Sequence, residues 1–330
     1  MSEASDSDAS AGARDEGPAE PVLSVFIMGA GVVGTALAVR LAGAGISVTG
    51  LHGRQVAPTD ALRAISGPLG VVRTTGEIPQ SLSESAAVIV AVRDDRISEV
   101  AARLVAEGRL RGGQILLHTS GANPARTILA VAAPQVRAVG TLHPLVSFAD
   151  ARAAVIHEGM PREIAFGIEG DEPARDLAKR IVRALGARAV ILEAESLALY
   201  HAGAVIASSY VIAMIDTARS LLVKAGVPAD QALPVLIPLL ASVVQNLAQV
   251  GLPDALTGPV ERGDVTVVER HLGALAARAP ELVELYRLVG RDVLRLAREK
   301  AKVDPASAAR LEGLFSGAMA GDNGGRSPGE

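Results

Sequence analysis

Cysteine is absent from the 330-residue sequence, and so is tryptophan. The lack of cysteine excludes disulfide bonds, thiolate nucleophiles and cysteine-ligated metal sites. Aromatic residues make up only 2% of the chain, so we expect no aromatic stacking surface for single-stranded nucleic acid. Lysine is also scarce, because the 32 basic residues include only Lys179, Lys224, Lys300 and Lys302 as lysines. The core must therefore be aliphatic, and few ammonium groups can take part in chemistry.

The chain also lacks a strong charge of either sign. Its net charge is −4, and residues 1–20 carry six acids and one arginine, which leaves the remainder at about +1. A nearly neutral folded part creates no general field toward nucleic acid or an anionic membrane, so we expect neither partner. The acidic N-terminal segment has no basic stretch of the signal-peptide type, and we expect a cytoplasmic protein. The six histidines show no metal-ligand spacing, and we expect no metal.

What the chain does contain is a series of short apolar runs that alternate with helical patterns. The runs predict strands at 22–28, 46–51, 87–92, 114–118, 138–142, 164–168 and 189–192, with helices at 35–44, 97–106, 124–132 and 172–185. This alternation predicts a parallel sheet with helices on both faces. After residue 193 only helices are predicted, at 196–222, 232–250, 265–277, 281–300 and 306–315. We therefore expect an α/β domain at 21–193, an all-α domain at 194–317 and disordered tails at 1–20 and 318–330.

Two segments of the predicted helical domain carry no charge over about the length of a bilayer span. They cover residues 196–215 and 231–253. Neither is flanked by a positive cluster or an aromatic belt. Helices that are apolar on all sides are otherwise buried in a large domain or between subunits. We therefore expect no membrane span and predict a homodimer.

A glycine-rich turn follows the first predicted strand and opens a helix. It reads Gly29, Ala30, Gly31, Val32, Val33 and Gly34, within a unit of about 30 residues that ends at Leu51. In this context the spacing is the dinucleotide-binding fingerprint of a doubly wound Rossmann domain. The first glycine allows the tight turn, the second lets backbone approach the pyrophosphate, and the third lets helix and strand pack closely. These six residues are predicted to bind the dinucleotide at the helix N-terminus.

The end of the second predicted strand indicates which dinucleotide binds. A carboxylate at this place would hold the ribose hydroxyl of NAD, but the chain has His52, Gly53 and Arg54 instead. The guanidinium of Arg54 suits a 2′-phosphate, so NADP(H) is favoured, with a merely solvated arginine as the alternative. Ligands of such sheets lie beyond the carboxyl ends of the strands, so further cofactor contacts are predicted from Val92, Asp94 and Thr119. We also expect Asp94 or Asp95 to cap the following helix.

Three further clusters are candidates for chemistry. The turn at Ser120 and Gly121, together with His143, is predicted to bind a substrate carboxylate, with a purely geometric turn as an equal alternative. On the charge-free helix, His201, Ser208 and Ser209 share one face, and an imidazole can donate a proton near neutral pH. A satisfied core histidine is the alternative there. In a loop between helices, Arg262 is a second candidate for the carboxylate.

These residues together resemble a group of oxidoreductases with a Rossmann-like domain followed by a helical C-terminal domain of unassigned function. The resemblance rests on the Gly29–Gly34 fingerprint and on these groups: Asp94-Asp95, His118-Thr119-Ser120-Gly121, His143-Pro144, Tyr200-His201 with Ser208-Ser209, and Gly258-Pro259 with Arg262-Gly263-Asp264. The group is similar to the wider set of ketopantoate reductase, pyrroline-5-carboxylate reductase and the β-hydroxyacid dehydrogenases. In that set a lysine and an asparagine usually project from the first long helix of the second domain. This chain has no lysine there before Lys224, and His201 and Ser209 occupy the analogous stretch.

The resemblance implies an NADPH-dependent reductase of a small 2-oxo acid such as ketopantoate, with His201 as the proton donor and Ser208 or Ser209 orienting the oxygen. An imine reductase of the pyrroline-carboxylate type is the close alternative. A non-catalytic NADP(H) sensor that binds a protein partner is the alternative from another class. A dimer whose cofactor only stabilises the fold is a further one.

Overall fold

The computed structural model describes residues 23–54, 70–148 and 163–317. The tails expected at 1–20 and 318–330 lie outside these residues. The chain divides into two compact units, Met1–Ser208 and Ser209–Glu330, each described below by itself. The division falls within a helical segment, C-terminal to the boundary that the sequence analysis places after Glu193.

The first unit is built on one sheet, which has eight strands within the described residues, in the order β3-β2-β1-β4-β5-β6-β7-β8. The strands are β1 (Ser24–Met28), β2 (Ser47–His52), β3 (Arg73–Thr74), β4 (Ala87–Val90), β5 (Ile115–His118), β6 (Ala138–Pro144), β7 (Ala165–Gly170) and β8 (Arg188–Ile191). The part from β3 to β6 is parallel throughout and has the doubly wound order, reversing between β1 and β4. The carboxyl ends of β1, β4, β5 and β6 therefore lie along one edge.

The expectation of an entirely parallel sheet is wrong at one pair. Strand β7 runs antiparallel to β6, with His143 opposite Gly167, and β8 is again parallel to β7. An antiparallel edge added to a parallel sheet is common in doubly wound proteins, and apolar periodicity does not encode strand direction. Strand β3 and the short helix α3 (Ser81–Glu84) were not predicted, since neither is long enough to show a periodic pattern.

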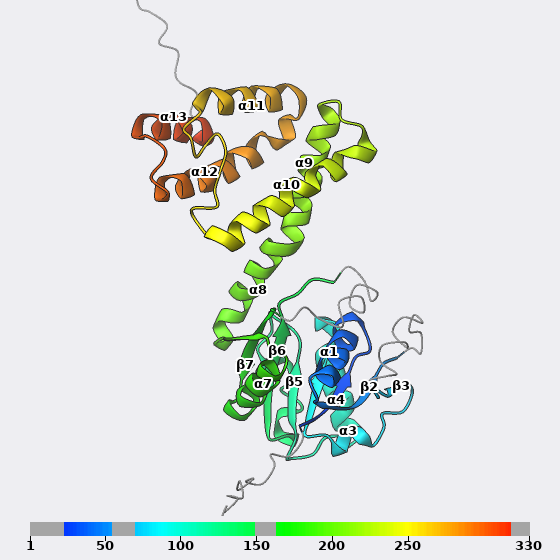
Figure 1. Cartoon of the computed structure of the whole chain (residues 1–330). Coiled ribbons are helices and arrows are strands. Elements are labelled where there is room, and N and C mark those ends of the chain that lie inside the picture. The colour runs from blue at the N-terminus through cyan, green and yellow to red at the C-terminus, as the bar shows by residue number, and fades with distance from the viewer. Residues whose placement is uncertain (1–22, 55–69, 149–162, 318–330) are drawn as a thin grey trace, which may run out of the picture. The chain divides into compact units, whose positions relative to one another are not determined.

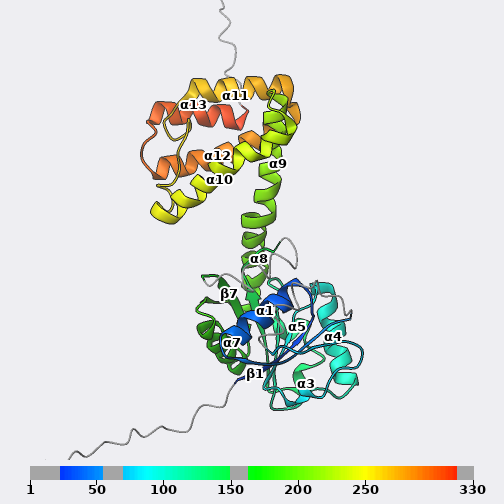
Figure 2. The same cartoon turned by 45° about the vertical axis from the view of Figure 1, so that its right-hand side comes forward.

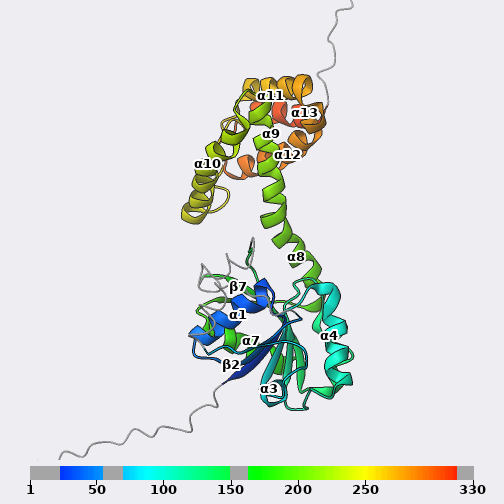
Figure 3. The same cartoon turned by 90° about the vertical axis from the view of Figure 1, so that its right-hand side faces the viewer.

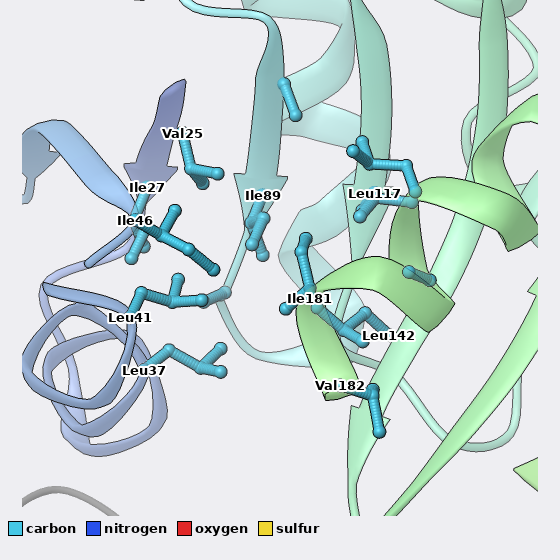
Figure 4. Packing of buried hydrophobic residues seen from close by; sticks show 14 of the residues in the cluster. Val25, Ile27, Leu37, Leu41, Ile46, Ile89, Leu117, Leu142, Ile181 and Val182 are labelled. Atoms are coloured by element: carbon cyan, nitrogen blue, oxygen red, sulfur yellow. The ribbon is translucent and has the colours of Figure 1, made fainter. Parts of the chain in front are cut away.

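Helices cover both faces of this sheet. Figures 2 and 3 show α1 (Val32–Gly43) and α7 (Glu172–Ala184) on one side, and α4 (Asp94–Ala106) on the other. The buried residues form one cluster per face. Leu37 and Leu41 of α1 and Ile181 of α7 pack against Ile27 and Ile89 of the sheet on the first face, as Figure 4 shows. Ile97 and Leu104 of α4 belong to the cluster on the second face. Both sides are aliphatic, as the composition predicts.

The second unit consists of helices α9 (Val211–Lys224), α10 (Ala229–Val250), α11 (Val265–Arg278), α12 (Val283–Glu299) and α13 (Pro305–Ser316). Figure 1 shows α11, α12 and α13 gathered together, in orange to red, and their shared core includes Val268, Leu294, Leu311 and Phe315. The last helix begins at Pro305, one residue before the predicted start, and the Asp304 side chain accepts from two backbone amides at its N-terminus. Asp264 caps α11 by accepting from one backbone amide, that of Val267.

Two local expectations about helices are corrected. Helix α4 begins at Asp94 with Arg93 as its N-cap, so neither Asp94 nor Asp95 is the cap. Both aspartates lie in the first turn, where their charge suits the helix dipole. The helix predicted at 124–132 is only α5 (Ala125–Ile128), because the backbone leaves the α-helical conformation at Leu129 and continues into a 3₁₀ turn at Ala133–Gln135.

The charge-free segments are helical but not buried within the chain. The stretches Ala194–Lys224 and Ala229–Val250 are long and apolar enough to cross a membrane by length and composition, and none of either window is buried. Val244 and Ile212 are 66% and 65% exposed. A helix of this kind in a single chain leaves a large apolar surface for something else to cover.

Candidate functional site

The turn between β1 and α1 has the geometry that a pyrophosphate cradle requires. Gly29 has a positive φ of 123°, and a Cβ at this position would lie 2.1 Å from the carbonyl oxygen of Ala91. A Cβ at Gly34 would lie 1.8 Å from the carbonyl oxygen of Gly29. Both positions therefore admit only glycine, because backbone atoms fill the space that a side chain would need.

Gly31 differs from its two neighbours in the fingerprint. Its φ is −79°, and a Cβ there would meet nothing within 4 Å. The protein itself therefore gives no reason for glycine at this position. The residue is the N-cap of α1, where no side chain caps the backbone amides. Open space above uncapped amides at a helix N-terminus fits the pyrophosphate of a dinucleotide.

The end of β2 lies beside this cradle. The backbone amide of Gly29 donates to the carbonyl oxygen of His52 at 2.8 Å. The His52 side chain is buried against Thr74, with 2.9 Å between Nδ1 and Oγ1, so it is directed into the unit. Burial lowers the pKa of His52, which stays neutral. Arg54 is exposed, and among the described residues its guanidinium has no partner. Of the three residues here, Arg54 is the one open to a ligand.

A buried polar chain joins β5, β6, β7 and α5. The amide of Ser120 donates to Nδ1 of His118 at 3.1 Å, so the proton of this imidazole sits on Nε2. Nε2 donates to Thr141 Oγ1 at 3.0 Å, and that hydroxyl donates to Glu169 Oε2 at 3.0 Å. The same carboxylate oxygen accepts from the Ala125 amide at 2.9 Å. Burial, with a smaller effect of His143, lowers the pKa of His118 to about 3.

The turn after β5 is fixed by a second set of contacts. The Ser120 hydroxyl donates to Asp94 Oδ2 at 2.6 Å, and the Asn123 side-chain amide contacts both partners, at 2.9 Å from Ser120 Oγ and 3.2 Å from Asp94 Oδ2. Both donors of Ser120 are therefore engaged within the protein. The prediction that its hydroxyl or amide binds a substrate carboxylate would require one of these bonds to break. Asp94, predicted to contact the cofactor, also holds this turn.

His143, at the end of β6, meets two aromatic side chains of α8 (Leu197–Val205). Its Nδ1 lies 3.1 Å from the hydroxyl of Tyr200. The rings of Tyr200 and His201 stand edge-on to it, with centroids at 5.6 and 5.8 Å. The imidazole also packs against Gly121, where a Cβ would lie 2.8 Å from Nε2. Burial, with a smaller effect of His201, lowers the pKa of His143 to about 4.

Several predicted residues are thus brought together within the first unit. The amide of Thr119 donates to the carbonyl oxygen of Val90, and Val92 Cγ1 lies 3.0 Å from where a Cβ of Gly29 would be. The ends of β1, β4 and β5 are therefore continuous from the cradle to Ser120. Beyond Ser120, Gly121 packs against the imidazole of His143, and the ring of His201 stands edge-on to that imidazole.

The remaining predicted residues are Ser208, at the end of the first unit, and Ser209 and Arg262, in the second unit. The Ser208 hydroxyl donates to the carbonyl oxygen of Ala204 at 2.7 Å and so serves its own helix. It lies in a π-helical turn, Ile206–Tyr210, which includes the division between the units. Ser209 and Arg262 belong to the second unit, and both are exposed.

The second unit holds a cavity of about 430 Å³. Its wall is mostly aliphatic, and its polar groups include His271 and Tyr286, with 2.8 Å between Nδ1 and the hydroxyl. This pair is a second histidine–tyrosine contact, of the same kind as His143–Tyr200 in the first unit. Within the described part of the chain, no group of three or more His, Asp or Glu residues could hold a metal ion.

Sequence reasoning missed Asn123, Glu169 and the role of Tyr200. Tyr200 was noticed only as a neighbour of His201, although an aromatic hydroxyl in a chain with three tyrosines was a signal. The part played by Glu169 depends on β7 lying beside β6. No local pattern contains that pairing.

Comparison with known proteins defines the class. Residues 8–144 match the family model of the Rossmann-like domain, and residues 164–293 match that of the domain of unknown function DUF2520. The chain therefore carries a Rossmann-like domain followed by a DUF2520 domain, in agreement with the predicted fold class. No curated protein matches the sequence.

Solved structures share the whole two-domain fold. A candidate NADP oxidoreductase from Bacteroides fragilis is 25% identical, with a TM-score of 0.58 over 83% of this chain and 98% of that one. A protein from Thermotoga maritima is 24% identical, with a TM-score of 0.64 over 84% of this chain and 100% of that one. A pyrroline-5-carboxylate reductase from Coxiella burnetii is 14% identical, with a TM-score of 0.53 over 89% and 98%. The chain thus has a fold in which dinucleotide-dependent oxidoreductases occur.

Proposed function

We propose that this protein is an NADPH-dependent oxidoreductase that reduces a small 2-oxo acid. The observation that carries the proposal is the continuity, within the first unit, of the open cradle at Gly31 with the cluster around His143 and His201. Solved structures with this fold support the oxidoreductase part of the proposal, since they include the Bacteroides oxidoreductase and an Aspergillus terreus imine reductase in complex with NADPH4.

The proposal assigns a part to each element of the site. NADPH would be held by Gly29, Gly31 and Gly34, with Arg54 at its 2′-phosphate, and would supply hydride to the carbonyl carbon. His201 donates the proton that the developing alkoxide needs. The carboxylate of the substrate is assigned to Arg262, whose guanidinium has no partner among the described residues.

The state of His143 is compatible with a carbonyl substrate. Because burial keeps this imidazole neutral, it offers one N–H donor and no positive charge. A neutral donor suits an oxygen that gains negative charge as it is reduced. The imine reductase alternative needs a proton on nitrogen, which His201 could supply in the same way, so the two substrate classes are separated by assay.

The deciding experiment is NADPH oxidation, followed by absorbance, across a panel of small 2-oxo acids and cyclic imines, with NADH in parallel. We expect turnover of a 2-oxo acid with NADPH preferred. His201→Ala should lower kcat by about 100-fold or more, while His271→Ala, which removes an exposed histidine of the second unit, should leave it unchanged. Arg262→Ala should raise KM for the acid with a smaller effect on kcat.

The other outcomes are equally informative. Turnover confined to imines would replace the 2-oxo acid by the imine alternative. Tight NADPH binding without turnover of any compound would favour the sensor. An unchanged KM in Arg262→Ala would remove this residue from carboxylate binding.

The proposed assembly is a homodimer. Helices α9 and α10 present apolar side chains on several faces, including Ile212, Leu239 and Val244, each more than half exposed. A second copy of this chain offers the same apolar helices and thus a self-complementary surface. Neither charge-free segment has the flanking positive cluster of a membrane span, which favours the second copy over a bilayer.

A further inference from the structure

The contact between Tyr200 and His143 is built by three elements. Tyr200 projects from α8, lies across Gly167 of β7 and reaches His143 of β6. A Cβ at Gly167 would lie 2.9 Å from the Tyr200 hydroxyl, so the phenol lies directly on the strand backbone. Its hydroxyl is 3.1 Å from His143 Nδ1. Because β6 and β7 pair at His143 and Gly167, the strand register places the phenol beside this imidazole.

The direction of this hydrogen bond follows from acidity and basicity. A phenol is a more acidic donor than a neutral imidazole N–H, and an imidazole nitrogen is a more basic acceptor than a phenol oxygen. Burial raises the pKa of Tyr200, so its proton stays on the oxygen, while a Gly167 backbone hydrogen bond acts in the opposite sense. The Tyr200 hydroxyl therefore donates to Nδ1, and the proton of neutral His143 sits on Nε2.

The Nε2 atom of His143 lies at the turn after β5. It lies beside the Gly121 backbone, in the turn held by Ser120 and Asp94. Among the described residues, no protein group accepts from it, whereas Nδ1 is engaged by Tyr200. His201 stands edge-on to the same ring. The nitrogen that is left for a ligand is thus a donor.

We propose that Tyr200 is a positioning residue: it holds His143 as the Nε2–H tautomer, which donates a hydrogen bond to the carbonyl oxygen of the substrate. The role of the bond in turnover rests on the proposed function, but the tautomer does not. In the opposite tautomer a nitrogen lone pair would face the oxygen, and the bond could not form.

The first test reads the tautomer directly and needs no substrate. Long-range 1H–15N correlation spectra of protein labelled in histidine, with His143→Gln to assign the signals, should show His143 protonated on Nε2 only. Tyr200→Phe, which keeps the ring, should shift His143 toward a mixture of tautomers and leave His271 unchanged. The matched control is Tyr286→Phe, which removes the equivalent contact to His271 in the second unit and should shift His271 alone.

The second test measures turnover. Tyr200→Phe should lower kcat at least tenfold with KM changed less than threefold, while Tyr286→Phe should change neither. His143→Gln, whose amide N–H can approach the position of Nε2, should retain at least tenfold more activity than His143→Asn, whose shorter amide corresponds to Nδ1.

Three outcomes decide the proposal. A wild-type His143 protonated on Nδ1, or a tautomer unchanged in Tyr200→Phe, overturns the positioning role. An altered tautomer with full kcat overturns its part in the reaction. If Tyr200 sets the tautomer but the wild type reduces no carbonyl compound, the proposed function fails while the positioning of His143 stands.

Discussion

The three glycines of the cradle differ in why glycine is present. Gly34 and Gly29 are glycines because protein backbone occupies the position of a side chain, whereas at Gly31 that position is empty. The same motif therefore contains two glycines that the fold requires and one that it does not, which we propose serves the cofactor. A substitution can tell the two apart.

Alanine substitutions at Gly31 and Gly34 should give opposite results. Gly34→Ala forces backbone to shift and should lower the free energy of unfolding by about 2 kcal/mol or more. Gly31→Ala should change it by less than about 1 kcal/mol but should weaken NADPH binding at least tenfold, because the new methyl group lies where the pyrophosphate approaches. Urea unfolding and fluorescence titration with NADPH provide the two readouts. Wild-type NADPH affinity in Gly31→Ala would contradict the cradle.

At the scale of elements, the buried chain from Ser120 through His118 and Thr141 to Glu169 links three strands and the start of α5. Its donors and acceptors match only if His118 is neutral, because a second imidazole proton would face the Ser120 amide. Burial is the main cause that lowers the pKa of His118 to about 3, and a pKa this low keeps the imidazole neutral as these hydrogen bonds require. The strands are therefore joined in a way that depends on pH.

Acid should destabilise the first unit through His118. Its pKa in the folded state is below the ordinary 6.5, so the unfolded chain binds more protons between these values, and stability is present above pH 6.5 and lost as pH falls. From pH 7 to pH 5 this histidine should cost roughly 2 kcal/mol of the free energy of opening. Hydrogen exchange of the β5 and β6 amides, corrected for intrinsic rates, measures it.

The control is His118→Asn, which lacks the titrating group. We expect it to be less stable at pH 7 and to show a flatter dependence on pH, with the lowered pKa values of His143 and His52 contributing to what remains. Equal slopes in the variant and the wild type would show that His118 does not carry the effect.

At the scale of the whole molecule, the second unit leaves apolar helices uncovered by their own chain. Val244 of α10 is 66% exposed, while Ala276 of α11 is exposed on a helix outside the charge-free segments. An aqueous protein rarely leaves so many large apolar side chains of two helices exposed. The proposed dimer accounts for it.

A charge in this surface should dissociate the dimer. Val244→Glu should lower the mass measured by sedimentation from two chains toward one, because an isolated carboxylate would be buried at the interface. Ala276→Glu adds the same charge elsewhere and should leave the mass unchanged. A monomeric wild type would refute the dimer, and a wild type recovered only from detergent-extracted membranes would indicate a bilayer instead.

The sequence by itself determined the order of the elements, the aliphatic core and the dinucleotide fingerprint. These are local properties, because periodicity, turn glycines and helix caps such as Asp304 act within a few residues. The sequence also indicated His143 and His201 as candidate site residues, because His143 follows an apolar run and His201 interrupts one. The doubly wound α/β domain and the helical domain after it could be predicted for the same reason.

Only the tertiary structure decided what those residues meet. The antiparallel pairing of β7 with β6 brings Gly167 opposite His143 and Glu169 opposite Thr141, and it is invisible in periodicity because apolar alternation is the same for either strand direction. Tyr200 and Asn123 enter the site through contacts between residues far apart in the chain. Such contacts are set by packing and strand register, so they exist only once the chain has folded.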